Sequence, residues 1–553
     1  MLSILLSWCY ILFISTGFGI GFSKSAKLDL SKTPTFVFLN GLFAYTVFAW
    51  LFSYLFAINA YFYALGIFIN SLLIIKHKTS VISIFSDLKQ KFKSFRLGIK
   101  ISFGIIFLLA LAQSSTCPSL PDNSSYYVQT IKWLNEYGLV KGLINLHPFL
   151  GQTSAWHILQ SAFGFGFLGG FWGELLNDLN AYIFLITVFF SLDKLNQYIF
   201  KKSTHQTLLS FGLLPVLSIL LFKFMDSPSP DLPVILIAQI IFFLFISNFE
   251  KININDYKEI LILSVFLVLI KLTALPILLL TFVLWAKHRV VRNRTKFTLL
   301  LLAGAFMLLV SKNYILTGYV FYPFSLGTNW FEADWKYPEI LMHFMQQTGK
   351  TQSLALSWNQ NVFHNFYMWL QQTGWHKFFN TAYVFLLVIF PFMIRNINNK
   401  KAYLTIYLFG LFQFVTLLFI SPQYRFFLYF FIFFILVLLS LFLSKKLILP
   451  VLFSGIFVAG ISVLPNKTNK FSEINMLLPN PNASFNGRYL KHQVQNFEYY
   501  YPDDDDDFFW ETENAPLPAV HRNLIDYFKE NFGTLPQRRT RFLKDGFKTL
   551  IME

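Results

Sequence analysis

Long apolar runs separated by short polar segments make up most of the chain. The runs reach about 17 to 23 residues, the length that an α-helix needs to cross roughly 30 Å of hydrocarbon. The pattern therefore predicts an all-α, polytopic membrane protein with about fourteen spans. The predicted spans cover residues 2–21, 35–55, 57–76, 97–116, 180–199, 207–224, 232–247, 259–271, 274–286, 297–313, 379–395, 402–420, 426–444 and 447–464.

Two segments depart from this regular pattern. The stretch AWHILQSAFGFGFLGGF, within residues 155–172, is long enough to cross, but a span there would move Lys201 and Lys202 away from the side of the other basic clusters. We therefore interpret it as a re-entrant or interfacial helix, whose polar groups protein or water must cover. The pair 259–271 and 274–286 is short, with Lys271 at its bend.

The net charge of +17 lies mainly in short connections beside the predicted spans. Seven basic residues and one acid fall within residues 76–100, and five basic residues without an acid fall within 287–296. Such Lys and Arg clusters mark the cytoplasmic face, so the charge indicates orientation and no nucleic-acid partner. The segment SDLKQKFKSFRLGIK is also compatible with an amphipathic helix on anionic membrane lipid.

With these clusters inside, the long polar segments fall on the outer face. They divide the chain into N-terminal helices with a basic loop (1–96), a transmembrane module (97–464) and a small extracytoplasmic C-terminal region (465–553). The C-terminal region holds 13 of the 28 acids and is large enough for a small folded unit. The outer segments are the loops 117–178 and 314–378, the turns 225–231 and 421–425, and this C-terminal region.

Five charged residues lie at the predicted outer ends of spans: Asp122, Asp226, Asp231, Lys271 and Arg425. A carboxylate close to hydrocarbon is costly, so its default interpretation is functional. Acids here would serve as a general base or hold a divalent cation, and the basic residues would neutralise a phosphate.

Each of these residues also has a structural interpretation. Asp122 is suited to cap the amphipathic helix predicted from NSSYYVQTIKWLNEYG. Asp226 and Asp231 suit a Pro-rich turn. Lys271 is long enough to snorkel to the interface, and Arg425 would serve as a topological anchor.

Other polar and aromatic residues carry weaker signals. The histidines, His147 among them, show no metal-ligand spacing, so no metal site is assigned. Aromatic residues of loop 314–378 are candidates for a sugar or acceptor surface, with an interfacial belt as the alternative. They are Trp330, Trp335, Trp358, Trp369 and Trp375. The Asp503–Asp507 run suits a solvated segment, with Ca²⁺ or a basic partner as the alternative.

The motifs DNSSYYVQTIKWLNEYGLVKGLINLHPFLGQTSAWHIL, VLIKLTALP, SPSPDLP and SPQYRF resemble integral-membrane GT-C glycosyltransferases, as does the later FFWETENAPLP. The resemblance covers residues 97–464 and implies a GT-C-like fold. It implies that Asp122 is the catalytic base and that Lys271 and Arg425 face the phosphate of the donor. Asp226, Asp231, Tyr126 and His147 complete the substrate-binding candidates.

The resemblance implies transfer of a sugar from a polyprenyl-phosphate donor to a glycan, lipid or protein acceptor. The reaction would take place at the outer face of the bacterial cytoplasmic membrane, with no cofactor unless a divalent cation takes part. Two alternatives remain open: a transporter or flippase of lipid-linked saccharide, and a non-catalytic subunit of an envelope complex. In the second, the C-terminal region would contact an envelope protein.

Overall fold

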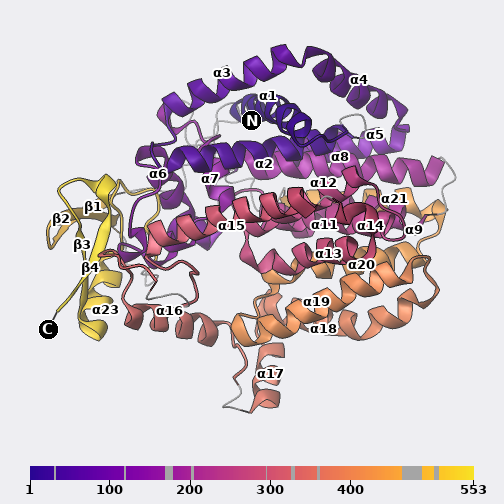
Figure 1. The fold of residues 1–553 in the computed structure, drawn as a ribbon. Coiled ribbons are helices and arrows are strands. Elements are labelled where there is room, and N and C mark those ends of the chain that lie inside the picture. The colour runs from indigo at the N-terminus through magenta and orange to yellow at the C-terminus, as the bar shows by residue number, and fades with distance from the viewer. Residues whose placement is uncertain are drawn as a thin grey trace.

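The computed structural model is predominantly helical, and the helices of the first 463 residues form one bundle (Figure 1). The structure describes residues 1–29, 33–116, 120–168, 178–200, 205–293, 295–325, 330–357, 361–463, 488–503 and 510–552. The predicted Lys201 and Lys202 cluster, Trp358 and most of the Asp503–Asp507 run lie outside these residues.

Within the described residues, nine helices are long and apolar enough to cross a membrane. They are α1 (Leu2–Ser25), α2 (Pro34–Ser53), α5 (Leu97–Ser114), α8 (Asp178–Phe200), α11 (Asp231–Asn248), α15 (Thr295–Thr317), α18 (Gly374–Met393, extended to Asn396 by a 3₁₀ turn), α19 (Lys400–Ile420) and α21 (Ile448–Val463, preceded by a turn from Lys445). A bent pair raises the number to ten if it counts as one span.

The prediction of fourteen spans is therefore wrong, because several predicted spans are shorter helices. Residues 207–224 form α9 (Gln206–Gly212) and α10 (Ser218–Phe222), with a 3₁₀ turn between them. The other three are α12 (Ile254–Ile270), α13 (Leu275–Lys287) and α20 (Leu428–Phe442). From Tyr257 to Ile270 every residue of α12 is buried, so its apolar character reflects burial in protein as much as in lipid.

The remaining predicted span, 57–76, is one arm of the bent pair α3 (Ala60–Lys76) and α4 (Lys78–Ser94), which meet at 87° over α1 (Figure 1). Ile84 of α4 packs with Ile20 and Val37, and Lys91 forms a 3.6 Å ion pair with Asp193 near the C-terminal end of α8. The basic segment therefore crosses one end of the bundle. Its contact with anionic lipid stays a prediction.

Short helices cover the opposite end of the bundle. Residues 123–127 form one π-helical turn that leads into α6 (Val128–Glu136). The predicted re-entrant segment contains only the seven-residue α7 (Ala155–Ser161), which is buried and too short to cross a bilayer. The outer segment between α15 and α18 forms α16 (Glu339–Gln352) and α17 (Val362–Leu370), whereas α14 (Arg289–Arg292) follows α13 away from α6 (Figure 1).

The C-terminal region contains strands, which the all-α prediction did not include. Strands β1 (Tyr489–Val494) and β2 (Phe497–Pro502) pair antiparallel, as do β3 (Thr534–Arg538) and β4 (Phe547–Ile551). Helix α23 (Arg522–Phe532) joins them in a second hydrophobic core. That core also includes Trp133 and Leu341 of the loops, so the C-terminal region packs onto the α6 and α16 end of the bundle (Figure 1).

Candidate functional site

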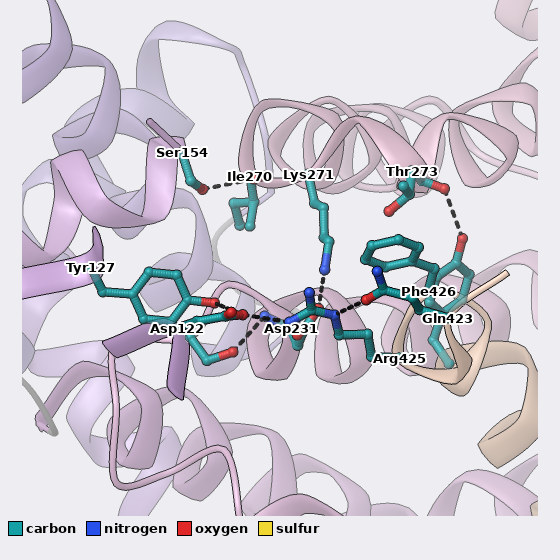
Figure 2. A network of polar contacts seen from close by, with 12 residues as sticks. Asp122, Tyr127, Ser154, Asp231, Ile270, Lys271, Thr273, Gln423, Arg425 and Phe426 are labelled. Carbon is teal, nitrogen blue, oxygen red and sulfur yellow. Dashed lines mark hydrogen bonds and ion pairs between the residues drawn. The ribbon is translucent and has the colours of Figure 1, made fainter. Parts of the chain in front are cut away.

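The break between α12 and α13 positions Lys271. Helix α12 ends at Ile270, Lys271 has extended backbone (φ −152°, ψ 119°), and Pro276 lies in the first turn of α13, where a proline costs no helical hydrogen bond. The Ser154 hydroxyl donates to the Ile270 carbonyl at 2.7 Å, which satisfies an acceptor left open at the helix end. The Lys271 side chain can therefore point sideways from the broken helix (Figure 2).

Asp231 begins α11 and is held in place by the preceding Pro-rich turn. Its backbone N–H donates to the Ser229 hydroxyl at 3.3 Å, and its side chain is buried. The amide of Asn180 donates to the carbonyls of Phe224, Ser227 and Ser229 at 2.8, 2.7 and 3.0 Å. A single buried amide thus fixes the turn and, with it, the start of α11.

Two ion pairs define what we call the charged cluster: Asp122, Arg425, Asp231 and Lys271. Arg425 Nη1 lies 2.5 Å from Asp122 Oδ2, and Lys271 Nζ pairs with Asp231 Oδ1 (Figure 2). The Tyr127 hydroxyl also donates to Asp122 Oδ2, at 3.2 Å. The cluster joins four chain segments and balances two acids with two bases.

The turn between α19 and α20 links the two ion pairs. Arg425 Nε donates to Gln423 Oε1 at 2.8 Å. The Phe426 ring centroid lies 4.5 Å from Lys271 Nζ and 5.4 Å from Arg425 Cζ, so one aromatic ring contacts both cations (Figure 2).

A buried amide fixes this turn against the break between α12 and α13. Gln413 donates to the carbonyls of Phe426 and Thr273, each at 2.9 Å. Its oxygen accepts from the Tyr429 hydroxyl at 2.6 Å, and Tyr429 also donates to the Thr273 carbonyl at 3.1 Å. The distance between Lys271 and Arg425 is thus set by buried hydrogen bonds.

The two ion pairs differ in exposure and in their electrostatics. The Asp122 and Arg425 side chains are 29% and 32% exposed, whereas Asp231 is 3% exposed. Burial lowers the pKa of Lys271 although Asp231 opposes this effect. Burial also acts against the charge of Arg425, but the Asp122 and Asp231 carboxylates outweigh it and raise the pKa of Arg425. Asp122 is therefore the carboxylate of the cluster that an external molecule can reach.

The capping role predicted for Asp122 is not what the structure shows. Asp122 has helical backbone (φ −59°, ψ −21°), and within the described residues its carboxylate makes no capping hydrogen bond. The carboxylate instead contacts Arg425 and Tyr127. The helix continues through the π-helical turn at Asn123–Tyr127, a feature often found at functional sites.

The other candidate residues lie at varying distances from the charged cluster. Tyr126 packs edge-on against Tyr127 with ring centroids 4.6 Å apart, so it adjoins the cluster. Burial, reinforced by Asp122, raises its pKa above the usual range. Asp226 is buried in the turn before α11, whereas the ion pairs are formed by Asp122 and Asp231.

His147 is occupied by contacts with the C-terminal region. Its Nε2 lies 3.0 Å from the Trp510 carbonyl, which can only accept, so Nε2 is the protonated nitrogen. Its Nδ1 accepts from the Phe149 N–H at 3.3 Å. Burial lowers the pKa of His147 to about 4. With both ring nitrogens engaged, His147 joins two parts of the chain, and its predicted substrate contact gains no geometric support.

The described tryptophans of loop 314–378 differ in their exposure. Trp330 and Trp375 are about two-thirds exposed, whereas Trp369 is fully buried and donates to the Pro422 carbonyl at 2.8 Å. Trp335 lies beneath Lys141 and Arg539. Trp369 is therefore unavailable to a sugar, whereas a sugar or acceptor surface at the exposed Trp330 and Trp375 stays a prediction.

The C-terminal region attaches two residues after Asp122. The Ser124 carbonyl accepts from the backbone N–H groups of Thr512 and Glu513 at 3.0 and 2.8 Å, and its hydroxyl donates to Glu511 at 2.9 Å. Lys132 donates to the Ala515 carbonyl at 2.8 Å. Residues 511–515 of the motif FFWETENAPLP thus support the loop that carries Asp122.

Sequence reasoning missed Asn180, Gln413 and Gln423, which position the charged groups. Their signal was weak: a single amide within or beside an apolar helix, where a buried polar group needs partners. Among the described residues, no group of three or more His, Cys, Asp or Glu side chains is arranged to hold a metal ion. A divalent cation stays a prediction.

Together, the apolar helices and the charged cluster at one end define a multi-pass helical membrane protein. The sequence model of a family described as a domain of unknown function, DUF8201, matches residues 1–432, and the chain belongs to that family. The match includes all four residues of the charged cluster. No curated protein and no solved structure matches the chain.

Proposed function

We propose that the protein is a membrane glycosyltransferase that moves a sugar from a polyprenyl-phosphate donor to an acceptor hydroxyl. The reaction takes place at the outer face of the bacterial cytoplasmic membrane. The observation that carries this proposal is the ion pair between Arg425 and the partly exposed carboxylate of Asp122, beside the Lys271–Asp231 pair.

In this mechanism a donor phosphate replaces the Asp122 carboxylate on Arg425. A phosphate oxygen suits the guanidinium as well as a carboxylate does, so the exchange keeps Arg425 paired and releases Asp122. Lys271 contacts the same Phe426 ring as Arg425 and adds a second positive charge. Binding of the donor would thus activate the base.

The released Asp122 accepts the proton of the acceptor hydroxyl. The hydroxyl oxygen bonds to the anomeric carbon, the bond from that carbon to the phosphate oxygen breaks, and its electron pair remains on the phosphate. Arg425 and Lys271 stabilise the charge that develops there. Attack opposite the departing phosphate inverts the anomeric centre.

A direct test supplies the purified chain with a short polyprenyl-phosphate sugar and an acceptor mixture. The expected result is release of polyprenyl phosphate together with labelled glycan or lipid, measured by mass spectrometry. Binding of the donor without turnover in the presence of membrane extract as acceptor source would contradict the proposal.

A buried acid within the bundle favours a second candidate, a transporter of lipid-linked saccharide. Glu259 of α12 accepts from the Asn40 amide at 3.1 and 3.0 Å and lies about three helical turns from Lys271. Buried intramembrane acids often mark transport paths. Under this alternative, Glu259→Gln would reduce flipping of a fluorescent lipid saccharide in proteoliposomes, whereas the transferase predicts no flipping in wild type or variant.

A further inference from the structure

Lys223, at the end of α10, is a half-buried cation surrounded by aromatic rings. Its Nζ donates to the Tyr424 hydroxyl at 2.6 Å. It lies 4.7 and 4.9 Å from the ring centroids of Tyr424 and Phe224, and 5.8 Å from that of Phe379. Within the part of the chain that the structure describes, Lys223 forms no ion pair.

This environment differs from that of the charged cluster next to it. Arg425 follows Tyr424 directly, but Arg425 and Lys271 each have a carboxylate partner. Cation–π contacts and one phenol hydroxyl stabilise the Lys223 ammonium only partly, because neither supplies a negative charge. An anion that reaches Lys223 therefore pairs with its positive charge and does not have to displace a carboxylate.

His376 and Phe379 of α18 complete the surroundings. The Phe379 ring stacks on Tyr424 with centroids 4.7 Å apart and an interplanar angle of 6°. His376 contacts the same ring edge-on at 5.0 Å, and it is exposed. Phe379 and His376 of α18 thus hold the Tyr424 ring in place. The His376 imidazole supplies a second nitrogen donor beside that ring.

One side of α18 is apolar and exposed, as expected for a membrane helix that faces lipid. The exposed side chains share a helical spacing of three, four or seven residues, which places them on one face of the helix. They are Trp375, Phe378, Phe385, Val388 and Phe392, each more than half exposed. His376 lies on the opposite side of α18, which faces Tyr424, so the exposed face borders lipid behind the site and does not lead into it.

We infer that Lys223, Tyr424 and His376 form a binding site for the phosphate of a lipid phosphate whose chain stays in the surrounding bilayer. The inference deepens the proposed function and rests on a lipid phosphate being its ligand. The Lys223 ammonium and the His376 imidazole contact the phosphate oxygens. The same phosphate can then move on to Arg425. The lipid phosphate thereby enters beside the charged cluster before it replaces Asp122.

Binding of farnesyl phosphate to the purified full-length protein tests this site, with farnesol and inorganic phosphate as the comparison ligands. A charge-assisted hydrogen bond lost at Lys223 predicts a roughly 10- to 100-fold weaker affinity for farnesyl phosphate in Lys223→Met. Lys350→Met removes an exposed lysine at the end of α16 and is the matched control. We expect it to bind like wild type.

Unchanged affinity in Lys223→Met would overturn the inference, as would equal binding of farnesol. Equal binding of inorganic phosphate would overturn the assignment to a lipid. Should Lys223→Met fail to fold, Tyr424→Phe keeps the ring stacking and removes the hydroxyl, and it should weaken binding several-fold. Asp122→Asn should still bind farnesyl phosphate, so loss of transfer and loss of this site are distinguishable.

Discussion

Arg425 and Asp122 form an ion pair although 303 positions separate them in the sequence. The pair brings the loop after α5 into contact with the turn between α19 and α20. Gln423 and Tyr127 hold its two members from either side, at 2.8 and 3.2 Å. The Asp122 and Arg425 side chains are thus restricted to one geometry. In this geometry Arg425 is paired with the carboxylate that the proposed reaction needs as its base.

Replacing Arg425 by Gln should reduce sugar transfer by about 10²-fold or more, because a developing phosphate charge loses its main partner. Folding should change little, since the partly exposed Asp122 can be solvated. Transfer assays together with thermal unfolding would separate the two effects. Arg539→Gln, which breaks an exposed ion pair with Asp334, is the control and should keep full activity. Normal transfer by Arg425→Gln would remove Arg425 from the mechanism.

Asn180→Ala should destabilise the bundle. Three buried carbonyls lose their shared donor, and the Trp156 indole N–H, 2.7 Å from Asn180 Oδ1, loses its acceptor. A buried unsatisfied group costs about 1–3 kcal/mol, so unfolding in detergent should occur several degrees lower. Asn531→Ala, at an exposed site in α23, should stay within about 0.5 kcal/mol of wild type. Equal effects of the two substitutions would contradict the role given to Asn180.

Acid should weaken the attachment of the C-terminal region. Burial lowers the pKa of His147 to about 4, below the value of roughly 6.5 expected in the unfolded chain. The unfolded state therefore binds more protons as the pH falls from about 6.5 towards 4, and stability falls with it. Between pH 7 and pH 5 the expected loss is about 2 kcal/mol.

Limited proteolysis at the two pH values measures this effect. His157 is also buried and its pKa is lowered to about 3, so it contributes in the same direction. His147→Gln removes the titration of His147 and leaves that of His157. It should therefore reduce the pH dependence of proteolysis without abolishing it. A variant with the same pH dependence as wild type would show that His147 does not couple acid to this contact.

The charged cluster and the C-terminal region should face the same side of the membrane, opposite the basic 287–296 connection. In a chain with Cys9 and Cys117 replaced by Ser, a cysteine at Lys544 should react with a membrane-impermeant thiol reagent in intact cells. A cysteine at Arg289 should react only after lysis. Reversed labelling would place the cluster in the cytoplasm and exclude a donor at the outer face.

The grouping of Asp122, Lys271 and Arg425 follows from the sequence because each lies beside an apolar segment on the same predicted outer side. The number of spans does not, since hydropathy cannot separate burial in lipid from burial in protein. Helix α11 illustrates this: 89% of its apolar window is buried inside the protein, against 17% for α15.

Long-range contacts account for the other differences. His147 looked available because nothing near it in the sequence indicates that Trp510 returns to bind its ring. Lys223 has no signal of its own in the sequence, because the Phe379 and Tyr424 rings that contact it come from α18 and the 421–426 turn. The strands of the C-terminal region were missed because its polar, acid-rich composition dominated the interpretation.

Asp122→Asn tests the central claim most directly. The amide keeps the size of the side chain and an oxygen for Arg425 and Tyr127, but it cannot accept the acceptor's proton. General-base loss predicts a fall of about 10²–10⁴-fold in transfer from a polyprenyl-phosphate sugar, with near-normal accumulation and farnesyl phosphate binding at least as strong as in wild type. A stable Asp122→Asn protein that transfers sugar at the wild-type rate would contradict the account.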